Sequence, residues 1–365
     1  MNEERKATIT DVARRAGVST ATAGRVLGGY GYSSTDMKTR VQDAATALGY
    51  SPNLLARSLI TGLTRTIGFV AGDIQSPFYA KILRGISDAA DEAGFALLIT
   101  NSDETIEREV DAIRLLREKQ VDGMIVSPCD TQRSPHLRDA AAATPLVLID
   151  RQVRGLDVDS IGVDNVEAVQ TGIARLIERG HRRIGMVAEL QSTRPDELAT
   201  FVSGICADPA TDVSTLYPSW QRLAGFVRAH TAAGVPVDLS LIAQVGDYSM
   251  EEAERQARAM LARSDRPSAL FTADGLMTEG TMHAITACGL RIPDDLSLVG
   301  FDELDWMAFV SPGIDAIAQP RRLMGQRATQ MLIERMDQAD LAPRKLTLAA
   351  RQILRGSVRT VTPTG

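Results

Sequence analysis

Residues 9–27 read ITDVARRAGVSTATAGRVL, and this short stretch decides how the chain is organised. Its apolar residues recur at i, i+3, i+4 and i+7, which predicts one face of a helix. Thr8 followed by Asp11 matches a capping box, and Gly17 can supply the positive φ of a tight turn. Ser19 offers a hydroxyl to the start of a second helix. The stretch therefore predicts a helix, a turn and a helix.

The second predicted helix presents small polar side chains and one arginine. Its outward set is Thr20, Ala21, Thr22 and Arg25, and its inward set is Ala23, Val26 and Leu27. Short polar residues and a guanidinium suit the major groove of DNA, where a guanidinium bonds guanine twice, worth about 1–3 kcal/mol in discrimination. The alternative is an ordinary surface pair of helices, because short motif matches are weak.

The distribution of charge agrees with DNA contact at the N-terminus. The 365 residues, 44% of them hydrophobic, carry a net charge of -6. Residues 1–61 hold eight Lys or Arg and five Asp or Glu, whereas the remainder holds 32 basic and 41 acidic residues. A basic N-terminal segment followed by an acidic remainder confines contact with DNA phosphates to the N-terminal segment. The length predicts two or three compact units.

The cysteines, the histidines and the apolar stretches give little support to a metalloprotein, an enzyme or a membrane protein. Cys129, Cys206 and Cys288 have no metal-ligand spacing and are expected to be reduced thiols. The four histidines are scattered, and no GxSxG, HExxH or Walker sequence occurs. No apolar run approaches the roughly 18 residues that span a bilayer, and the N-terminus has no signal-peptide pattern. We expect a soluble cytoplasmic protein without catalysis, metal or cofactor.

Beyond Arg65, short apolar runs alternate with amphipathic stretches. The predicted strands are TIGFVAGDI, FALLIT, DGMIVSP, PLVLID, SIGVDN, RIGMVAEL, SALFTADG and LSLVGFDE, and the predicted helices cover 77–93, 105–119, 165–179, 222–232, 250–262 and 277–288. Strands separated by helices predict parallel sheets covered on both faces. The fold class is α/β, with a helical headpiece followed by two doubly wound lobes.

Two segments join the headpiece to the lobes. A third helix begins at Ser34 and stops at Gly49, and residues 50–62, YSPNLLARSLITG, form barely two helical turns. A helix that short is marginal in water and needs a partner to fold. We interpret it as a candidate switch.

The stretches TITDVARRAGVSTATAGRVL and LGYSPNLLARSL resemble the headpiece of the lactose-repressor (LacI/GalR) family of bacterial transcription regulators, and the resemblance extends over nearly the whole chain. It implies lobes similar to periplasmic sugar-binding proteins, crossed three times by the chain. The implied domains are a helix-turn-helix headpiece over 1–50, a hinge helix and linker over 51–64, and an effector-binding and dimerisation body over 65–365. Lobe 1 is expected over 65–162 and 291–318, and lobe 2 over 163–290 and 319–357.

The resemblance also implies a set of DNA-binding residues. In the family, recognition-helix residues read base edges, and a hinge leucine, here Leu59, wedges into a base step from the minor groove. The candidates are Thr10, Ser19, Thr20, Ala21, Thr22, Arg25, Asn53, Ala56, Arg57 and Leu59. The alternative for the hinge is that its leucines pack against the body. Gly24, where the family commonly has Ser, weakens the helix by roughly 1 kcal/mol.

A small ligand is expected between the lobes. Carboxylates at the carboxyl ends of parallel strands point into the ligand crevice of such sheets, and aromatic rings stack on sugars or bases. The candidates are Asp73, Phe78, Tyr79, Asp150, Arg151, Trp220, Tyr248, Asp274 and Asp302. Each residue alone is also compatible with a solvated loop carboxylate or a packed ring.

Two departures from the family pattern concern this ligand. Trp220 replaces a common Arg, and Ala273 replaces the Asn that usually precedes Asp274. The exchange removes polar contacts and adds a stacking face, so the effector is expected to be unusual. Residues 191–219 form a long segment predicted as a loop, which would either carry Arg194 toward the cleft or be a surface insertion.

These observations predict a homodimeric repressor that binds a pseudo-palindromic double-stranded operator under control of a small, sugar-like effector. The alternatives are a solute-binding protein without a DNA function, a nucleoside or other non-sugar effector, and a diverged enzyme on the same scaffold. No contact with a membrane is expected. The sequence does not distinguish induction from co-repression.

Overall fold

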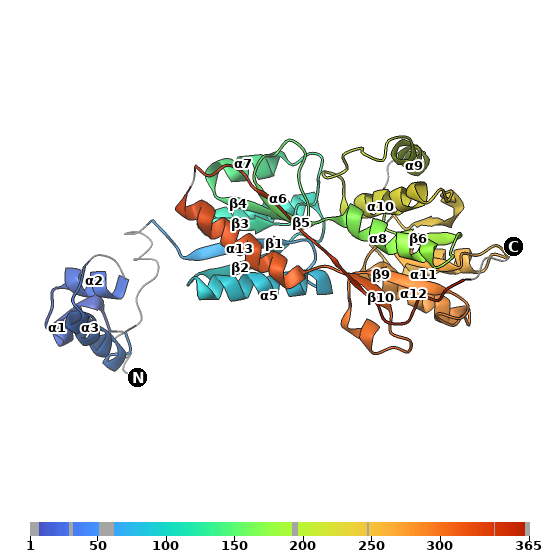
Figure 1. Cartoon of the computed structure of the whole chain (residues 1–365). Coiled ribbons are helices and arrows are strands. Elements are labelled where there is room, and N and C mark those ends of the chain that lie inside the picture. Colours follow the sequence, from blue (N-terminus) through green and yellow to red (C-terminus); the bar gives the residue numbers. More distant parts are fainter. Residues whose placement is uncertain are drawn as a thin grey trace. The chain divides into compact units, whose positions relative to one another are not determined.

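The computed structural model describes residues 7–28, 32–50, 62–191, 196–246, 248–338 and 340–361. The chain divides into two compact units, the first comprising Met1–Thr66 and Gln120–Asp122 and the second comprising the rest (Figure 1). Most of the predicted hinge helix, including Asn53, Ala56, Arg57 and Leu59, lies outside the described residues.

The described residues of the first unit form three helices that pack on one another. They are α1 (Ile9–Ala16), α2 (Thr20–Gly28) and α3 (Thr35–Ala47). The predicted capping box is present at Thr8 and Asp11, and Gly17 adopts the left-handed region at φ 68°. The Ser19 hydroxyl accepts a hydrogen bond of 3.1 Å from the Thr22 amide. Small apolar side chains such as Val12, Ala23 and Val41 fill the core. The helix-turn-helix prediction is confirmed.

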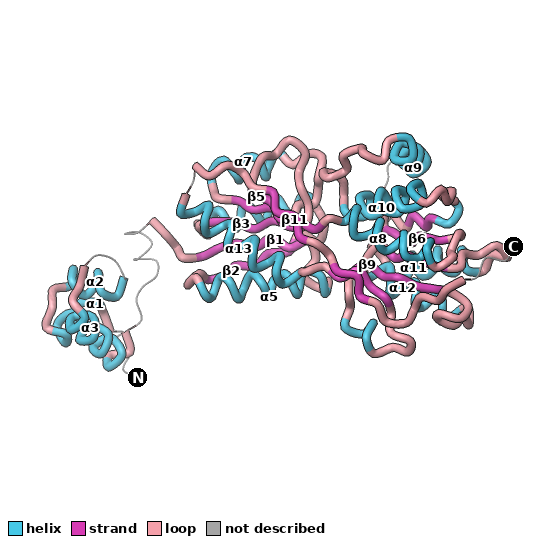
Figure 2. The backbone as a smooth tube through the Cα atoms, in the orientation of Figure 1, coloured by secondary structure: helices cyan, strands magenta, loops and turns pink. Residues whose placement is uncertain are grey.

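The second unit is built on two six-stranded sheets, one in each lobe (Figure 2). The first sheet has the order β11 (Lys345–Leu348), β5 (Asp159–Val163), β4 (Leu146–Ile149), β3 (Gly123–Val126), β1 (Thr66–Ala71) and β2 (Ala96–Asn101). The second has the order β12 (Arg351–Ile353), β10 (Asp315–Ala318), β9 (Ser297–Phe301), β8 (Ala269–Thr272), β6 (Ile184–Ala188) and β7 (Ile242–Gln244). Strand β12 runs antiparallel to β10, whereas β6, β8, β9 and β10 are parallel.

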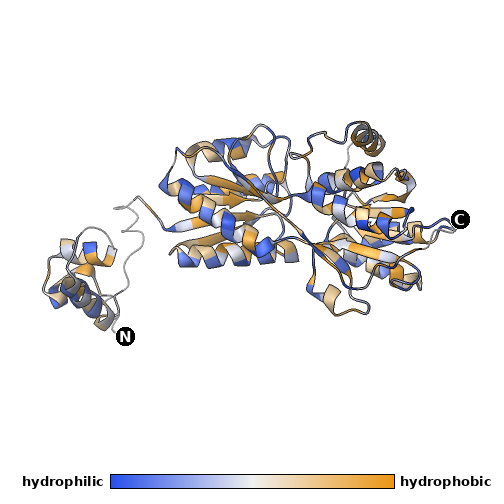
Figure 3. Cartoon of the chain, viewed as in Figure 1, coloured by the Kyte–Doolittle hydropathy of each residue, from blue (hydrophilic) through white to orange (hydrophobic). Residues whose placement is uncertain are grey.

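Helices cover the sheets of both lobes. Lobe 1 has α5 (Pro77–Glu92), α6 (Ile106–Glu118), α7 (Pro135–Ala143) and α13 (Arg321–Asp337). Lobe 2 has α8 (Asn165–Glu178), α9 (Glu197–Ala207), α10 (Pro218–Ala232), α11 (Met250–Leu261), α12 (Gly275–Ala287) and the short helices Leu239–Leu241 and Asp305–Ala308. The strands are hydrophobic along most of their length and the helices are amphipathic (Figure 3). In lobe 2, α8 and α10 share one core with the sheet, and α11 and α12 share another. This confirms the doubly wound prediction.

The expected division of residues 291–348 between the lobes was wrong, whereas β12 lies in lobe 2 as expected. Strands β9 and β10 pair with β8 in lobe 2, whereas β11 pairs with β5 in lobe 1 and α13 packs on α5. The chain therefore crosses between the lobes after β5, after β10 and after β11. The spacing of strands along a sequence does not reveal which sheet a strand joins, because sheet pairing is decided by contacts distant in sequence.

Two glycines allow α13 and α5 to approach closely. A Cβ atom on Gly85 would lie 2.0 Å from the Arg322 carbonyl oxygen, and a Cβ atom on Gly325 would lie 2.2 Å from the Ile82 carbonyl oxygen. Both distances are far below van der Waals contact, so any side chain would force the helices apart. The returning helix α13 is thereby held against the lobe that the chain left much earlier.

The prediction that residues 191–219 form only a loop was also wrong. Helix α9 occupies part of this segment and packs on α10, with the Phe201 and Trp220 rings edge to face at a centroid distance of 5.0 Å. Val202 and Ile205 enter the core of lobe 2. No helix in the described part of the chain is long and apolar enough to span a bilayer.

Candidate effector and DNA sites

A cavity of about 70 Å³ opens between the two lobes of the second unit. It is lined by Asp73, Ser76, Phe78, Tyr79, Glu104, Asp150, Arg151, Glu189, Tyr217, Pro218, Ser219, Arg222, Tyr248, Asp274, Asp302 and Gln319. A second cavity of about 400 Å³ shares five of these residues, including Asp73 and Tyr248. Most of the lining residues follow strands or begin helices, as expected for the crevice of parallel sheets.

The structure brings eight of the nine predicted effector residues to this cavity, and Trp220 is the exception. The Trp220 side chain is buried in the core of lobe 2, and its indole nitrogen donates to the Gln191 carbonyl oxygen at 3.2 Å. The prediction that Trp220 adds a stacking face to the cleft was wrong. Helix α10 begins at Pro218, so its cavity-facing positions are Pro218, Ser219 and Arg222, and Trp220 falls on the other side.

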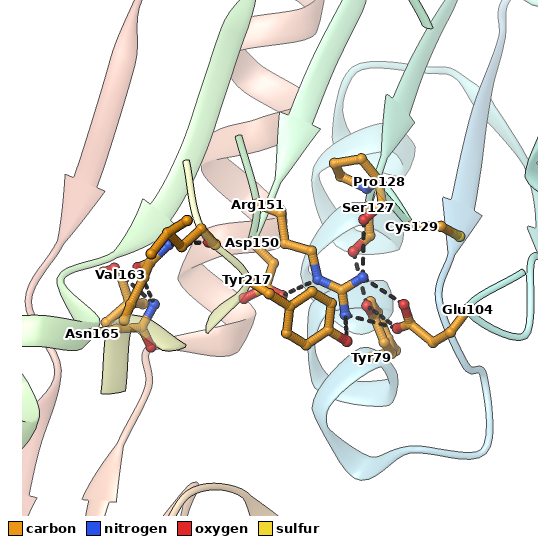
Figure 4. A network of polar contacts seen from close by, with 12 residues as sticks. Tyr79, Glu104, Ser127, Pro128, Cys129, Asp150, Arg151, Val163, Asn165 and Tyr217 are labelled. Atoms are coloured by element: carbon orange, nitrogen blue, oxygen red, sulfur yellow. Dashed lines mark hydrogen bonds and ion pairs between the residues drawn. The ribbon is translucent and has the colours of Figure 1, made fainter. Parts of the chain in front are cut away.

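Arg151 is the centre of a polar network in lobe 1 (Figure 4). Its two amino groups bond both carboxylate oxygens of Glu104, at 2.5 and 2.8 Å, and Nη1 also donates to the Pro128 carbonyl oxygen at 2.9 Å. Asp150 lies 3.4 Å from Nε as an ion pair. The guanidinium is therefore neutralised by two carboxylates of its own lobe.

The same guanidinium reaches across to lobe 2. Nη2 of Arg151 donates to the Tyr217 hydroxyl at 2.7 Å, and the guanidinium carbon lies 4.2 Å from the centroid of the Tyr217 ring. Gln132 makes a second crossing, from Nε2 to the Thr215 carbonyl oxygen at 2.8 Å. These contacts tie the segment before α10 to lobe 1.

Asp150 and Asp302 occupy equivalent positions in the two lobes. They follow β4 and β9, and both adopt positive φ angles, 72° and 69°. Aspartate tolerates this left-handed conformation better than most residues. The backbone turn directs both carboxyl groups to the crevice, where burial is the main cause that raises the pKa of Asp150.

Lobe 2 contributes buried carboxyl groups with perturbed pKa values. Asp274 accepts the Met277 amide at 2.9 Å as the cap of α12, yet burial raises its pKa to about 6. Burial, reinforced by the nearby Asp274 charge, raises the pKa of Glu189 to about 8. Both shifts reflect the cost of holding charge away from water.

Arg222 is the cation of the lobe 2 wall. It donates from Nε to Asn165 Oδ1 at 2.9 Å and from Nη1 to the Ala273 carbonyl oxygen at 2.7 Å. Its guanidinium carbon lies 3.9 Å from the centroid of the Phe301 ring. These contacts fix the side chain at the base of the crevice.

The sequence missed several lining residues, notably Glu104, Glu189, Tyr217 and Gln319. Glu189 follows β6 and Gln319 follows β10, so the rule of strand ends that selected Asp274 also applies to them. Tyr217 precedes α10, and no local signal marks it. Arg194 lies outside the described residues, so its role in the cleft stays a prediction.

The predicted DNA-reading residues of the headpiece lie at the surface. Thr10, Ser19, Thr20, Ala21 and Arg25 are exposed, and Thr22 is half-buried. Nη2 of Arg25 lies 3.4 Å from the Thr22 hydroxyl oxygen, a long and therefore weak hydrogen bond that leaves the guanidinium available. The structure is thus compatible with base contact by α2.

Comparison with known proteins is consistent with this architecture. Residues 8–53 match the model of bacterial regulatory proteins of the lacI family, and residues 173–358 match a periplasmic binding protein-like domain. The HTH-type transcriptional repressor PurR of Photobacterium profundum is 30% identical over 97% of this chain and 99% of its own length. This chain belongs to the LacI family. The CytR repressor of Escherichia coli is also 30% identical, over 98% of each chain.

Among solved structures, the lac repressor dimer bound to operator matches 97% of this LacI-family chain and 100% of its own chain. The TM-score is 0.79 at 23% identity, which supports the fold alone. The resemblance and fold class predicted from the sequence are confirmed. The relatives named here are transcriptional repressors and not enzymes.

Proposed function

We propose that this LacI-family protein is a transcriptional repressor that binds a pseudo-palindromic operator as a homodimer and responds to a small effector held between its lobes. One observation carries the proposal: a chain with a helix-turn-helix unit also has a polar cavity whose walls come from both lobes. A protein that only captured solutes would have no use for the headpiece.

We assign base reading chiefly to Arg25, because its guanidinium can bond guanine O6 and N7 together. Thr20 and Ala21 are small and exposed, so they can contact a thymine methyl or one base edge. Thr10, Ser19 and Thr22 are proposed as supporting contacts. Asn53, Ala56, Arg57 and Leu59 are proposed to read and bend the minor groove through the hinge.

The effector site is proposed to comprise Asp73, Phe78, Tyr79, Asp150, Arg151, Tyr248, Asp274 and Asp302, together with Glu104, Glu189, Arg222 and Gln319. Carboxylate oxygens accept hydrogen bonds from ligand hydroxyls, and the rings offer flat apolar faces. A sugar-like ligand suits this combination. A ligand that prefers one closure of the lobes would shift operator affinity by no more than its differential affinity for the two states.

We also propose that the protein turns over no substrate. His181 and His230 are buried outside the crevice, and burial lowers the pKa of both imidazoles. Arg151 pairs with Glu104 and Asp150, and the Met277 amide donates to Asp274, an arrangement suited to binding. Action on DNA places the protein in the bacterial cytoplasm.

The test is selection of double-stranded DNA from a random library by the purified full-length chain. We expect enrichment of one two-fold symmetric sequence, bound by two copies of the chain, because two headpieces joined through their bodies read two half-sites. Recovery of no preferred sequence at a fixed salt concentration would refute the repressor assignment.

A further inference from the structure

The effector crevice has an excess of hydrogen-bond acceptors. Among the described residues that line it, six are acidic, namely Asp73, Glu104, Asp150, Glu189, Asp274 and Asp302, and only Arg151 and Arg222 are basic. Tyr79, which also lines the cavity, carries no positive charge. Its hydroxyl forms a 2.8 Å hydrogen bond with the Ser127 hydroxyl. The described part of the wall therefore holds more acidic than basic groups.

The two guanidinium groups already make several hydrogen bonds, although Nε of Arg151 makes none and only forms an ion pair with Asp150 at 3.4 Å. Arg151 gives its amino groups to Glu104, Pro128 and Tyr217. Arg222 gives Nε and Nη1 to Asn165 and Ala273. A phosphate or carboxylate ligand would have to displace these bonds and would face the surrounding carboxylates, which disfavours an anionic effector.

Unpartnered polar atoms point independently to a ligand. Gln319 is 6% exposed, and its Nε2 donates to Asp302 Oδ1 at 2.9 Å. A carboxylate accepts but does not donate, so this bond fixes the amide orientation and leaves Oε1 as the free end. Gln319 Oε1 has no hydrogen-bond partner, and neither has the hydroxyl of Ser219, a residue that is 3% exposed. Both residues line the cavity, and an unmade buried hydrogen bond is costly.

Glu189 and Asp274 both line the cavity, and the Asp274 charge adds to the effect of burial in raising the pKa of Glu189. Glu189 lines the cavity although the residue is only 5% exposed. Nearby, Tyr248 and Phe78 line the same cavity. Aromatic faces attract organic cations, which adds a second favourable contact.

Resting on the proposed effector site, we infer that the effector is a small polyhydroxylated amine, whose ammonium group binds between Glu189 and Asp274 and whose hydroxyl groups donate to Asp302 and to Gln319 Oε1. An ammonium group offers three donors and accepts nothing, which matches a wall of acceptors. In the described residues, no three carboxylates, imidazoles or thiols are grouped to hold a metal ion, so an organic cation is favoured over a metal.

The test uses the full-length chain and calorimetric titration with matched compounds. Each of glucosamine, galactosamine and 2-amino-1,3-propanediol is compared with its hydroxyl parent and its N-acetyl derivative, and glucose 6-phosphate, gluconate and Mg²⁺ are added as anionic and metal probes. We expect at least one amine to bind 10-fold or more tightly than both of its neutral counterparts. Failure of every amine, or tightest binding by a neutral, anionic or metal probe, would overturn the inference.

The variant Glu189→Gln preserves the shape of the side chain and removes its charge. We expect it to reduce the preference for the amine over the parent hydroxyl compound at least 10-fold, whereas Glu178→Gln, at an exposed position on α8, should leave the preference unchanged. An unchanged preference in Glu189→Gln would contradict the assigned position of the ammonium group. The matched ligands test the inference with the natural chain even if the variant fails to fold.

Operator selection is measured on the same preparation. A chain that still selects a symmetric DNA sequence but binds no amine would retain the repressor function and lose only the effector class. A chain that binds the amine but selects no DNA would retain the effector class and lose the repressor function.

Discussion

The Arg151 guanidinium of lobe 1 stacks 4.2 Å from the Tyr217 ring centroid of lobe 2 and donates a 2.7 Å hydrogen bond to the Tyr217 hydroxyl. Because Arg151 is held by Glu104 and Pro128, its position is fixed before Tyr217 approaches. The pair therefore forms a contact between the two lobes, called the latch below, at the wall of the cavity where an effector would bind.

Weakening this latch should open the crevice in steps. Tyr217→Phe removes the hydrogen bond and keeps the ring, whereas Tyr217→Ala removes both. A hydrogen bond to a charged group contributes about 1.5–3 kcal/mol. We expect backbone amides around residues 72–80 to exchange with deuterium several-fold faster in Tyr217→Ala, and less so in Tyr217→Phe. Tyr32→Phe, at an exposed headpiece residue, serves as the control. Identical exchange in Tyr217→Ala and the natural chain would contradict the latch.

A buried ion pair should secure the return of the chain to lobe 1. The Asp159 carboxylate is buried and bonds Arg335 and Arg344, each at 2.9 Å. Burial alone would raise the pKa of Asp159, but the hydrogen bonds from the two arginines outweigh it and hold the pKa below its ordinary value of 3.8. A lowered pKa stabilises the fold above 3.8, and this contribution is lost as the pH falls below that value.

We therefore expect Asp159→Asn to reduce the free energy of unfolding by about 3 kcal/mol at pH 7, because it removes the buried carboxylate charge that pairs with both Arg335 and Arg344. The loss should shrink as the pH drops toward 3. Urea unfolding followed by circular dichroism at several pH values measures both effects. A loss that stayed constant with pH would show that the charge of Asp159 is not responsible.

Close packing of α13 on α5 makes a further prediction. Gly325→Ala places a methyl group 2.2 Å from the Ile82 carbonyl oxygen. Overpacking of this kind costs about 1–3 kcal/mol. We expect a matching decrease in the unfolding free energy, while Gln330→Ala on the exposed face of the same helix should change it by less than about 0.5 kcal/mol. Equal stability of Gly325→Ala and the natural chain would show that the two helices can separate freely.

The carboxyl group of Glu189 should make the unliganded protein less stable at high pH. Its pKa is raised from 4.5 to about 8, first by burial and then by the Asp274 charge. Between these values the folded protein holds a proton that the unfolded chain has lost, so stability decreases as the pH rises through this window. Arg222 and Arg151 only partly offset the effect.

Glu189→Gln should accordingly stabilise the protein more at pH 8.5 than at pH 5, by a difference on the order of 2 kcal/mol, since a glutamine cannot ionise. Thermal unfolding of the two proteins at both pH values measures the difference. If the variant is stabilised equally at both, ionisation of Glu189 does not limit stability.

The helix-turn-helix unit was predictable because its signals are local. The capping pair Thr8 and Asp11 and the turn at Gly17 act within a few residues, and the structure contains both. Asp150 and Asp302 were predictable for a similar reason, because a strand end points to the crevice wherever the sheet is parallel.

Other features depend on contacts that are distant in the sequence. The Arg151–Glu104 and Arg151–Tyr217 contacts join residues that are 47 and 66 positions apart. Trp220 was misplaced because it was assigned by its match to a family position, whereas the helix α10 that begins at Pro218 turns its side chain into the core of lobe 2. Which lobe β9, β10 and α13 join depends on how the strands pair in the sheets, and the hydrophobic periodicity of the sequence does not encode this pairing.

The most direct test of the central claim is the ratio of affinities for selected operator and random DNA, measured for Arg25→Ala at one fixed salt concentration. We predict at least a 10-fold fall in this ratio, because each half-site loses a base contact worth about 1–3 kcal/mol. Arg15→Ala, an exposed arginine on α1, should weaken both DNAs alike and leave the ratio unchanged. An unchanged ratio in Arg25→Ala would contradict sequence reading by α2.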